Sequence, residues 1–477
     1  MEYMVRFIQM HEEFRRPELD AIAELLEIDI TWVAYDENSP FAIIAINQAD
    51  DPTAAAKGLV SRAIMVSAVF ELWGFGDSYD TLHADIKDRS SHVWPSYQEC
   101  SFRFEMDAYH SSHTHAQRRG IFESLSYMAF RGPIVMSTPN ERFTIFEDYD
   151  LDSNVPKQVL FGRYLGEGGR KAMSTYDLKK RSYISTTSMD AELSLVTANM
   201  AQCAPGKLAY DPFMGTGSFP VSCAHFGSAV FGSDLDGRSI RGKKGRSVMS
   251  NFKQYSTASL YFGGLAADLT NSPLHTRRFL DAIVCDPPYG VREGLKVLGH
   301  AKESLQHEVI LNNGMKAHLQ ADYIPPKRPY SFLRMLDDIM DFSASRLVNG
   351  GRLCMWMPVA GAPEDADGDT AGEQETEEYA IPQHPALVVV SECTQYFNKW
   401  SRRLLTYKRI PDEEVDAEAL AAVQLLRLQL ESNGHADLGA NDLNAFRKKY
   451  FQGFKTPLFQ QFHPEPRDQS RTPEPST

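Results

Sequence analysis

The chain has few cysteines, and none of them form a paired motif. Six cysteines are spread over 477 residues, and no two stand in a C-x-x-C arrangement. Disulfide frameworks and structural zinc sites need closely spaced cysteines, so we predict neither, and no metal site. Sparse, scattered cysteines are typical of a reducing compartment, which predicts a cytoplasmic protein.

Long hydrophobic runs are also missing. No window holds about 18 uncharged apolar residues in a row, so no transmembrane helix is expected. The first residues, MEYMVRFIQMHEEFRRPELD, contain several acids and lack a long apolar centre, which is not the pattern of a signal peptide. The apolar content of 43% and the charged content of 23% are those of a globular chain.

The net charge of −14 is unevenly distributed. Residues 1–150 contain 12 Lys and Arg against 25 Asp and Glu, whereas residues 151–350 contain 24 against 18. A basic middle can attract a polyanion although the whole chain is acidic, because the local charge decides the contact. A nucleic-acid substrate is therefore not excluded.

The order of predicted elements divides the chain into several parts. Residues 1–76 run strand, helix, strand, strand, helix, strand, which predicts a ferredoxin-like α+β module. Residues 77–170 form a second small α+β unit that ends in an apparent hairpin, ERFTIFEDYD followed by KQVLFGRYLG. Strands and helices alternate over residues 171–411, which is typical of a Rossmann-like parallel sheet. Residues 412–477 begin as a helix and end in a Pro-rich tail, and the acidic stretch 362–378 is too polar to bury a core.

Three stretches of the α/β domain carry finer predictions. The segment GRSIRGKKGRSVMSNFKQY, residues 237–255, predicts one continuous basic helix. The segment SFLRMLDDIMDFSASRLVNGG predicts a helix closed by Gly350 and Gly351. The segment SLYFGGLAADL, residues 259–269, is short, apolar and Gly-containing, and it is either an exposed edge strand, the candidate that the family resemblance described below implies, or a segment buried within the domain.

Four aspartates stand where strands of the parallel sheet are predicted to end, namely Asp211, Asp234, Asp268 and Asp286. Ligands of open α/β sheets bind beyond the carboxyl ends of the strands. Four acids at such ends therefore predict a ligand site. For each single Asp the alternative remains that it caps the following helix or turn.

The stretch DPFMGTGS narrows the kind of ligand. Gly215 and Gly217 let the backbone approach a ligand closely. Pro220 takes the place of the third glycine of a dinucleotide fingerprint, and no phosphate-loop Gly-Lys-Ser/Thr follows. Asp211 suits a cationic amino-acid group, and Asp234 suits ribose hydroxyls. The pattern predicts a pocket for a nucleoside that carries an amino acid.

The stretch DPPYG after the apolar run LDAIVC is an unusual end for a strand. Two prolines remove two N–H donors and leave rigid carbonyl acceptors. Asp286 and the carbonyl of Pro287 can accept both hydrogens of an exocyclic amine, and Tyr289 can stack on the base. We therefore predict Asp286, Pro287, Pro288 and Tyr289 as catalytic residues. The alternative is a simple turn with Tyr289 packed over it.

These motifs, DPFMGTGS, GSDLD, AADLT and DPPY, resemble in order and spacing those of S-adenosylmethionine-dependent amino-methyltransferases. Three further features resemble in particular the THUMP-containing family of eukaryotic tRNA (guanosine-10-N2)-methyltransferase catalytic subunits. They are the two front modules, the stretch KKRSYISTTSMDAELSLVTANMA and the stretch KRPYSFLRMLDDIMDFSASRLVNGGRLCMWMP. The resemblance implies a class I methyltransferase domain behind a ferredoxin-like module and an RNA-binding THUMP domain. It implies methyl transfer from S-adenosylmethionine to the N2 amine of guanosine 10 of tRNA.

The resemblance also implies binding residues and a partner. Cofactor contacts are expected from Thr187, Ser188, Asp211, Phe213, Gly215, Gly217, Ser218, Asp234 and Asp268. A small zinc-binding activator protein is expected to form a heterodimer by adding to the edge strand at 259–269.

Basic side chains predict where tRNA would dock. The candidates are Arg118, Arg119, Lys179, Lys180, Arg181, Lys327 and Arg328, with Arg170–Lys171 and Lys243–Lys244 as further runs. The long stretch 291–328 is predicted to be a lid or guide for a base that leaves its stack. For every charged run the alternative is a solvated surface.

Two alternatives to this function remain open. The same motifs would serve methylation of adenine N6, cytosine N4 or a protein amide, and the two front modules favour RNA. A methyltransferase fold can also act as an RNA-binding scaffold without catalysis, but the intact DPPY motif and Gly turn argue against that.

Overall fold

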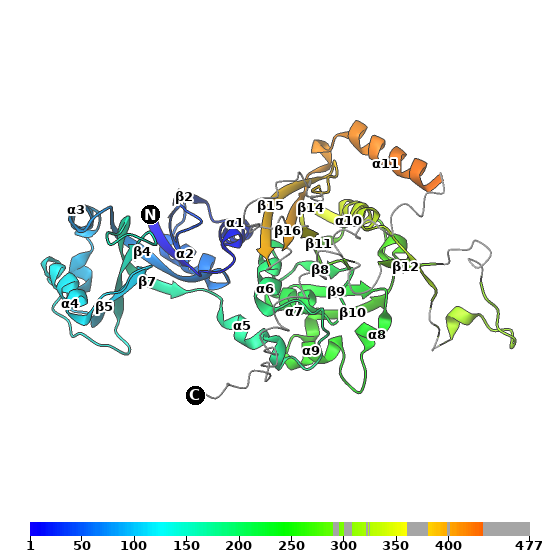
Figure 1. The fold of residues 1–477 in the computed structure, drawn as a ribbon, viewed down its shortest axis with the longest axis horizontal. Helices are drawn as coiled ribbons and strands as arrows, with labels where there is room; N and C mark the ends of the chain where they lie inside the picture. Colours follow the sequence, from blue (N-terminus) through cyan, green and yellow to red (C-terminus); the bar gives the residue numbers. More distant parts are fainter. Residues whose placement is uncertain are drawn as a thin grey trace, which may run out of the picture. The chain divides into compact units, whose positions relative to one another are not determined.

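The computed structural model describes residues 1–289, 295–299, 308–320, 323, 325–359, 380–397 and 401–432 (Figure 1). The chain forms two compact units. The first unit comprises Met1–Gly206, Val221–Ser228 and Ser250–Leu260, and the second comprises Lys207–Pro220, Ala229–Met249 and Tyr261–Thr477. The predicted acidic insertion 362–378, the Pro-rich tail and much of the predicted lid lie outside the described residues.

Within the described ranges, none of the helices has the length and apolar character that crossing a membrane requires.

The first unit is built on a seven-stranded sheet in the order β2-β3-β1-β4-β7-β6-β5. Its strands are β1 Glu2–Phe7, β2 Ile30–Ala34, β3 Phe41–Ile46, β4 Val66–Gly76, β5 Phe102–Tyr109, β6 Glu141–Asp148 and β7 Gln158–Glu167. Its helices are α1 Arg15–Leu25, α2 Pro52–Ser61, α3 Tyr79–Ser90, α4 His115–Ser124, α5 Lys171–Tyr176 and α6 Ala191–Met200. The first six elements follow the predicted ferredoxin-like order β-α-β-β-α-β.

Strand β4 joins the two halves of this sheet. It pairs antiparallel with β1 along one edge and with β7 along the other. The predicted β6–β7 hairpin is confirmed, and β5 adds to β6 in parallel. The sheet thus runs without interruption past residue 76, and the two front modules share one sheet.

A buried polar network fixes helix α6 to the front of the first unit. The Glu18 carboxylate accepts hydrogen bonds from the backbone N–H groups of Ile64 (2.9 Å) and Met65 (2.7 Å). It also accepts one from Asn199 of α6 at 2.7 Å, and Asn199 accepts one from Arg62 at 2.8 Å. Burial raises the pKa of Glu18. Because this network ties α6 to α1 and to the start of β4, the front of the chain and α6 form one body.

The second unit contains another seven-stranded sheet, in the order β10-β9-β8-β11-β14-β16-β15. Its parallel strands are β8 Leu208–Asp211, β9 Ala229–Asp234, β10 Tyr261–Ala266, β11 Leu280–Cys285 and β14 Leu347–Val359. Strands β16 Ser401–Arg409 and β15 Leu387–Tyr396 close it as the predicted antiparallel pair. Strands β12 Lys296–Leu298 and β13 Lys327–Pro329 form a separate small ladder.

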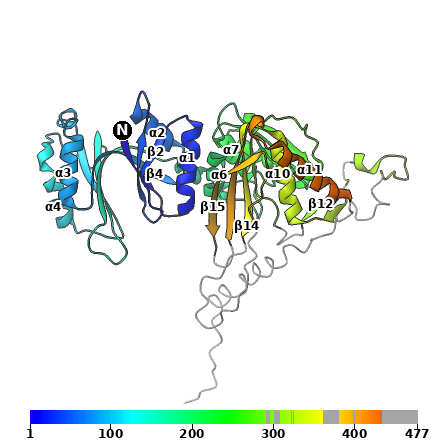
Figure 2. The same ribbon diagram turned by 90° about the horizontal axis from the view of Figure 1, so that it is seen from above.

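The second unit also contains several helices. They include α8 Gly237–Arg241, α10 Phe332–Arg346 and α11 Ala417–Ser432, while α7 Ser218–His225 and α9 Val248–Gln254 contain residues of both units. Helix α10 covers one face of the sheet (Figure 2). Its residues Met335, Leu336 and Ile339 recur at helical spacing and pack with Ile283 and Leu353 of the strands.

Two predicted helices are wrong in their extent. The predicted helix 237–255 is interrupted, because Gly242, Lys244 and Gly245 have φ values of 64°, 54° and 77°, which a right-handed helix excludes. The predicted C-cap at Gly350 and Gly351 is also wrong, because both glycines lie inside β14. Gly350 has a φ of 80° there, and the register between β11 and β14 shifts near it. These glycines make an irregularity in a strand.

Candidate active site

Three of the predicted aspartates lie at neighbouring strand ends. Asp211 is the last residue of β8, Asp234 is the last residue of β9, and Asp286 directly follows β11. Strand β8 lies between β9 and β11, and all three strands are parallel. Their carboxyl ends therefore meet at one edge of the sheet, where open α/β sheets bind ligands.

The charges of Asp234 and Asp286 both act on Asp211. Burial raises the pKa of Asp211 well above its usual value, and the charges of Asp234 and Asp286 raise it further. Burial also raises the pKa of Asp234 and of Asp286. Carboxylates that lie close together in a partly buried site repel each other, and a bound cation would relieve that repulsion.

Two glycines shape the turn between β8 and α7. Gly215 has a φ of 50° and Gly217 a φ of 86°, which few other residues adopt. A side-chain carbon added to Gly215 would meet nothing closer than the Phe213 carbonyl at 4.0 Å. The same atom on Gly217 would lie 2.9 Å from a methyl of Val248. Gly215 thus leaves open backbone for a ligand, whereas Gly217 permits close packing.

Asp234 holds this turn in place. Its Oδ2 accepts a hydrogen bond from the backbone N–H of Gly215 at 2.9 Å, and its Oδ1 accepts one from Asp236 at 2.8 Å. Each carboxylate oxygen has a second lone pair, so the oriented group can still accept from a ligand hydroxyl. Burial raises the pKa of Asp234, whereas these N–H groups and the charge of Lys327 lower it. Lys327, a predicted tRNA contact, therefore lies near this carboxylate.

Asp268 has a structural position. Its Oδ1 accepts from the backbone and the hydroxyl of Thr270, each at 2.9 Å, and its Oδ2 accepts from the backbone of Leu298 at 2.6 Å. The side chain is buried and ties β12 to the end of the sheet. Asp268 thus fits the alternative stated for a single aspartate, which is that it caps the turn that follows the strand.

Asp286 presents one oxygen to the protein and keeps the other without a partner. Its side chain is 22% exposed, and its Oδ2 lies 3.6 Å from Nη1 of Arg402. Its Oδ1 is buried and accepts no hydrogen bond from any residue that the structure describes. A buried acceptor without a protein partner is a place for a donor on a ligand. Sequence reasoning missed Arg402, which lies on β16 and has no local motif.

The rest of the DPPY loop surrounds this oxygen. Pro287 is buried, Pro288 is exposed, and Tyr289 is partly buried and packs against the core of the second unit. Burial raises the pKa of Tyr289 well above its usual value, so its hydroxyl stays neutral. The loop thus places a carboxylate and a ring side by side.

The remaining predicted cofactor residues fall in both units. Thr187 is exposed and Ser188 is partly buried, and both precede α6 in the first unit. In the second unit, the backbone N–H of Phe213 donates to Asp211 at 2.9 Å, and Ser218 begins α7 as a buried residue. Phe213 and Ser218 therefore belong to the turn that Asp234 holds.

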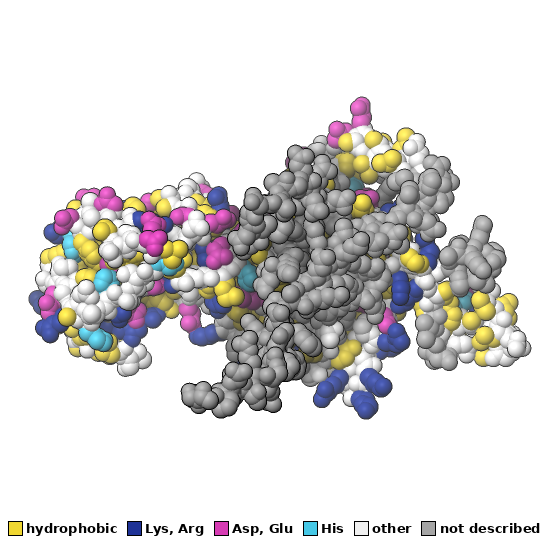
Figure 3. All heavy atoms as spheres, in the orientation of Figure 1, with side chains coloured by type: hydrophobic (Ala, Val, Ile, Leu, Met, Phe, Trp, Pro, Cys, Tyr) yellow, Lys and Arg dark blue, Asp and Glu magenta, His cyan; other side chains and the backbone are white. Residues whose placement is uncertain are grey.

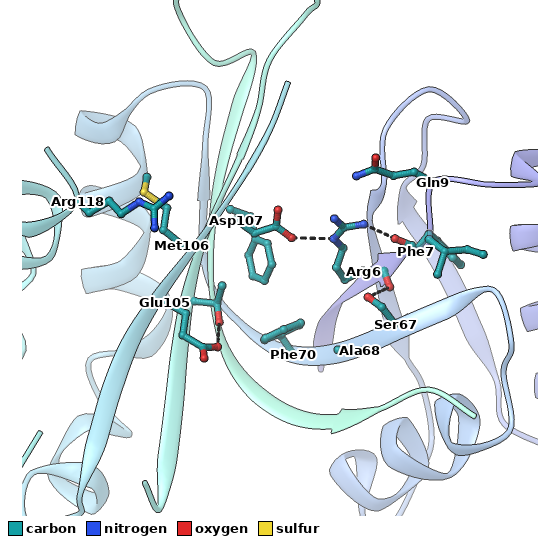
Figure 4. Close-up of a pocket in the computed structure, with 13 residues that line it drawn as sticks. Arg6, Phe7, Gln9, Ser67, Ala68, Phe70, Glu105, Met106, Asp107 and Arg118 are labelled. Atoms are coloured by element: carbon teal, nitrogen blue, oxygen red, sulfur yellow. Dashed lines mark hydrogen bonds and ion pairs between the residues drawn. The ribbon is translucent and has the colours of Figure 1, made fainter. Parts of the chain in front are cut away.

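A cavity of about 720 Å³ lies in the first unit, and the predicted RNA-binding residue Arg118 lines it (Figure 4). Strands from both halves of the sheet contribute to the cavity. Arg6 of β1 reaches Asp107 of β5 across it, with Nε and Oδ2 2.8 Å apart. The cavity is therefore lined by charged groups of both signs above the aromatic rings of Phe70 and Phe146.

The other predicted RNA contacts differ in accessibility. Arg119, Lys179 and Lys180 are exposed; Arg119 pairs with Glu123 at 2.7 Å, and the Lys180 ammonium donates to the Ser174 carbonyl at 2.6 Å. In the remaining cases, Lys327 is exposed, Arg328 is partly buried, and Arg181 is only 5% exposed. The Arg181 guanidinium lies 5.9 Å from the Tyr255 ring, so this arginine is used inside the protein and not on its surface.

The break in the predicted basic helix creates a projecting basic turn, residues 241–246. The backbones of Lys243 and Arg246 hydrogen-bond to each other in both directions, at 2.9 and 3.1 Å. Arg241, Lys243, Lys244 and Arg246 are all exposed. Figure 3 shows dark blue side chains gathered on this turn. Sequence reasoning found the lysines but not the turn that presents them.

Two family models match parts of this chain. Residues 1–170 match a family described as the Tmrp11 THUMP N-terminal domain, and residues 179–312 match an RMKL-like methyltransferase domain. The crystal structure of TrmN from Thermus thermophilus aligns with 16% sequence identity and a TM-score of 0.40. The alignment covers 86% of this chain and 100% of the TrmN chain. Fold, strand-end site and family matches together define a Rossmann-like methyltransferase with a THUMP-related front domain.

Curated relatives give the particular family. The tRNA (guanine(10)-N(2))-methyltransferase of Saccharomyces cerevisiae is 42% identical over 85% of this chain and 92% of its own length. The enzyme of the same name from Schizosaccharomyces pombe is 34% identical over 94% and 96%, and human TRMT11 is 30% identical over 94% and 95%. The chain belongs to the tRNA (guanine(10)-N(2))-methyltransferase family, which confirms the predicted resemblance and fold class.

Proposed function

We propose that this protein transfers a methyl group from S-adenosylmethionine to the exocyclic N2 amine of guanosine 10 in tRNA. Family membership supports the reaction. The structural observation that carries it is the buried Oδ1 of Asp286, which has no partner among the described residues and stands at the shared edge of the strand ends. Neither a different base nor a scaffold role has an observation in its favour.

The residues at the strand ends fit S-adenosylmethionine. Asp211 and Asp234 supply negative charge for its cationic groups, and Asp234 is oriented to accept from ribose hydroxyls. Gly215 leaves the open backbone that such a ligand needs. When bound, S-adenosylmethionine supplies an electrophilic sulfonium methyl group.

The DPPY loop supports the orientation of the target amine. An exocyclic amine conjugated with its ring is a poor nucleophile, so the direction of its lone pair matters. Asp286 Oδ1 and the Pro287 carbonyl would accept its two hydrogens, and Tyr289 would stack on the base for about 1–3 kcal/mol. Orientation of this kind can contribute up to about 7–11 kcal/mol.

Basic surfaces on both units would bind the tRNA. In the first unit these are Arg118 at the cavity, Arg119, Lys179 and Lys180, and in the second unit Lys327, Arg328 and the basic turn. Phosphate contacts give affinity without reading sequence. A guanosine inside a folded tRNA must leave its stack to reach the DPPY loop.

The edge strand β10 is a docking place for a protein partner. It is the terminal strand of the second sheet, and Phe262 is 69% and Leu265 39% exposed. An apolar open edge otherwise favours aggregation. A small zinc-binding activator protein that adds to this edge would form the expected heterodimer. None of the six cysteines, all of which lie in the described ranges, forms a disulfide, which suits a reducing, cytoplasmic setting.

The test is an assay of the full chain together with a zinc-binding activator protein. Unmodified tRNA and labelled S-adenosylmethionine are incubated with the complex, and the labelled nucleoside is identified and mapped by mass spectrometry. We expect N2-methylguanosine at position 10, with no label on a tRNA that carries adenosine there. Label on adenine or cytosine, or no label with intact protein, would contradict the proposal.

A further inference from the structure

The Asp286 carboxylate has an unusual neighbour from a distant part of the chain. Strand β14 lies between β11 and β16, with Cys285 opposite Met355 on one side and Pro358 opposite Arg402 on the other. The Arg402 side chain reaches back across β14, so that its Nη1 lies 3.6 Å from Asp286 Oδ2. A long side chain spans a whole strand to meet this one oxygen.

The Arg402 guanidinium is held from several sides. Its central carbon lies 4.7 Å from the ring of Trp356 and 5.6 Å from the ring of Phe397. Its Nε donates to Oε1 of Gln395 at 2.7 Å. The side chain is only 13% exposed. Stacking on a fully buried tryptophan and a short hydrogen bond give the cation a defined position.

The two oxygens of the Asp286 carboxylate therefore have different surroundings. Oδ2 faces Arg402, whereas the buried Oδ1 has no hydrogen-bond partner in the described part of the chain. An ion pair that engages one oxygen of a carboxylate leaves the other oxygen available to a donor on a ligand. We propose that Arg402 is a positioning residue, which keeps Asp286 ionised and aims its free oxygen at the target amine.

The inference rests on the proposed function, because it assigns Asp286 the role of amine acceptor. A protonated Asp286 would place a hydroxyl where an acceptor is needed, and the amine would lose one of its two partners. Arg402 would therefore act on the rate of methyl transfer through Asp286, and not by touching the substrate.

The other groups that face Asp286 define how it titrates. On β8, the charge of Asp286 raises the pKa of the buried Asp211 further. Cys285 at the end of β11 stays a neutral thiol, because burial raises its pKa well above the usual value. Tyr289 on the same loop stays neutral for the same reason. Burial raises the pKa of Asp286, and the Arg402 cation and then the Tyr289 hydroxyl oppose this rise.

Arg403 provides a matched control. It is the next residue of β16, so its side chain points to the opposite face of the sheet. It is also buried, and it pairs with Glu392 at 2.8 Å. Arg403→Gln therefore removes a buried cation from the same strand without altering the surroundings of Asp286.

The experiment measures single-turnover methylation of tRNA by the complex, with saturating S-adenosylmethionine, across acidic and neutral pH. For Arg402→Gln we expect a rate constant about 100-fold lower at neutral pH. The acidic limb of its profile should move to higher pH, because Asp286 loses its cation. Arg402→Lys should keep the limb in place, and tRNA affinity should stay the same in both variants.

The control distinguishes positioning from stability. Arg403→Gln should lower the melting temperature and leave the acidic limb where it is. An unchanged limb in Arg402→Gln, or an equal movement in Arg403→Gln, would overturn the proposal. Should Arg402→Gln fail to fold, Gln395→Ala loosens the guanidinium without removing it. That variant must then lower the rate constant, and an unchanged rate would overturn the proposal.

A measurement without turnover separates this inference from the proposed function. Carboxyl-labelled aspartate in the full chain, with Asp286→Asn to assign the signal, reports the titration of Asp286 by NMR. Its midpoint should rise in Arg402→Gln, and an unchanged midpoint would contradict the role of Arg402. Failure of the wild-type protein to methylate guanosine 10 would instead contradict the proposed function.

Discussion

At the scale of residues, the same side chain does different work at similar strand ends. Asp268 uses both oxygens to hold backbone and hydroxyl donors of its own unit. Asp234 is held by two backbone N–H groups but keeps lone pairs for a ligand. Asp286 keeps a whole oxygen without a described partner. The number of bonds that the fold already supplies decides how much of each carboxylate a ligand can use.

Asp234→Ala should weaken cofactor binding and leave tRNA binding nearly unchanged. The change removes the acceptor for ligand hydroxyls and releases the Gly215 backbone from its hydrogen bond. Calorimetry with S-adenosylmethionine would show a loss of affinity of about tenfold or more, the value of one charge-assisted hydrogen bond. Asp268→Ala is the contrasting variant, in which a lower melting temperature is the main expected effect. Unchanged cofactor affinity in Asp234→Ala would remove this residue from the site.

Variants of Asp286 and Tyr289 separate a catalytic loop from a structural turn. Asp286→Ala should lower the single-turnover rate strongly with little effect on cofactor or tRNA affinity. Tyr289→Phe should be mild, because the ring face remains, and Tyr289→Ala should be severe, because stacking worth about 1–3 kcal/mol is lost. Thermal melts on the same proteins serve as the control. A stable Asp286→Ala protein that methylates at the wild-type rate would show that the loop is only a turn.

At the scale of elements, the strand edge and the basic turn are two exposed features of the second unit. Phe262→Asp, on β10, should reduce binding of the activator protein, because it places a charge on the apolar edge strand. Pull-down and gel filtration of the co-expressed pair would measure this. Met249→Asp, at a partly exposed residue of α9, controls for a general effect of surface charge. A fully active, monodisperse chain without any partner would contradict the docking proposal.

The basic turn should contribute affinity but not chemistry. Replacing Lys243 and Lys244 with alanine should weaken tRNA binding and lower the slope of its salt dependence by about 2, one per lost phosphate contact. Filter binding at several salt concentrations measures the slope. The single-turnover rate at saturating tRNA should stay the same, and an unchanged slope would show that the turn is only a solvated loop.

The elements also show what a sequence can predict. The parallel sheet and the β6–β7 and β15–β16 pairs follow from hydrophobic period and local motifs, and they were predicted correctly. The same holds for the places of Asp211, Asp234 and Asp286 at strand ends. The break at Gly242 was missed, because charged residues around a glycine fit a helix and a turn equally well. Arg402 was missed for another reason: its contact with Asp286 crosses an intervening strand, and no local pattern reports such a contact.

At the scale of the whole molecule, the buried network around Glu18 makes α6 part of the first unit. Asn199→Ala would leave the Glu18 carboxylate and the Arg62 guanidinium each one partner short. We expect the free energy of unfolding to fall by about 1–3 kcal/mol. Urea denaturation of the full chain measures it. Asn47→Ala, which removes an exposed hydrogen bond to Thr31, is the control and should change little, and an equal loss in both variants would contradict the network's role.

The continuous sheet of the first unit restricts where the chain can be divided into separately expressed fragments. Strand β4 uses both of its edges, one for β1 and one for β7. A fragment that stops at residue 76 would therefore expose the whole edge of β4 that pairs with β7. A fragment that starts at residue 76 would lack β4, with which β7 pairs. Both pieces would offer an open template to other chains. Expression of the front part alone should thus succeed only when residues 1–170 are kept together, so recombination among relatives would have to exchange this region as one block.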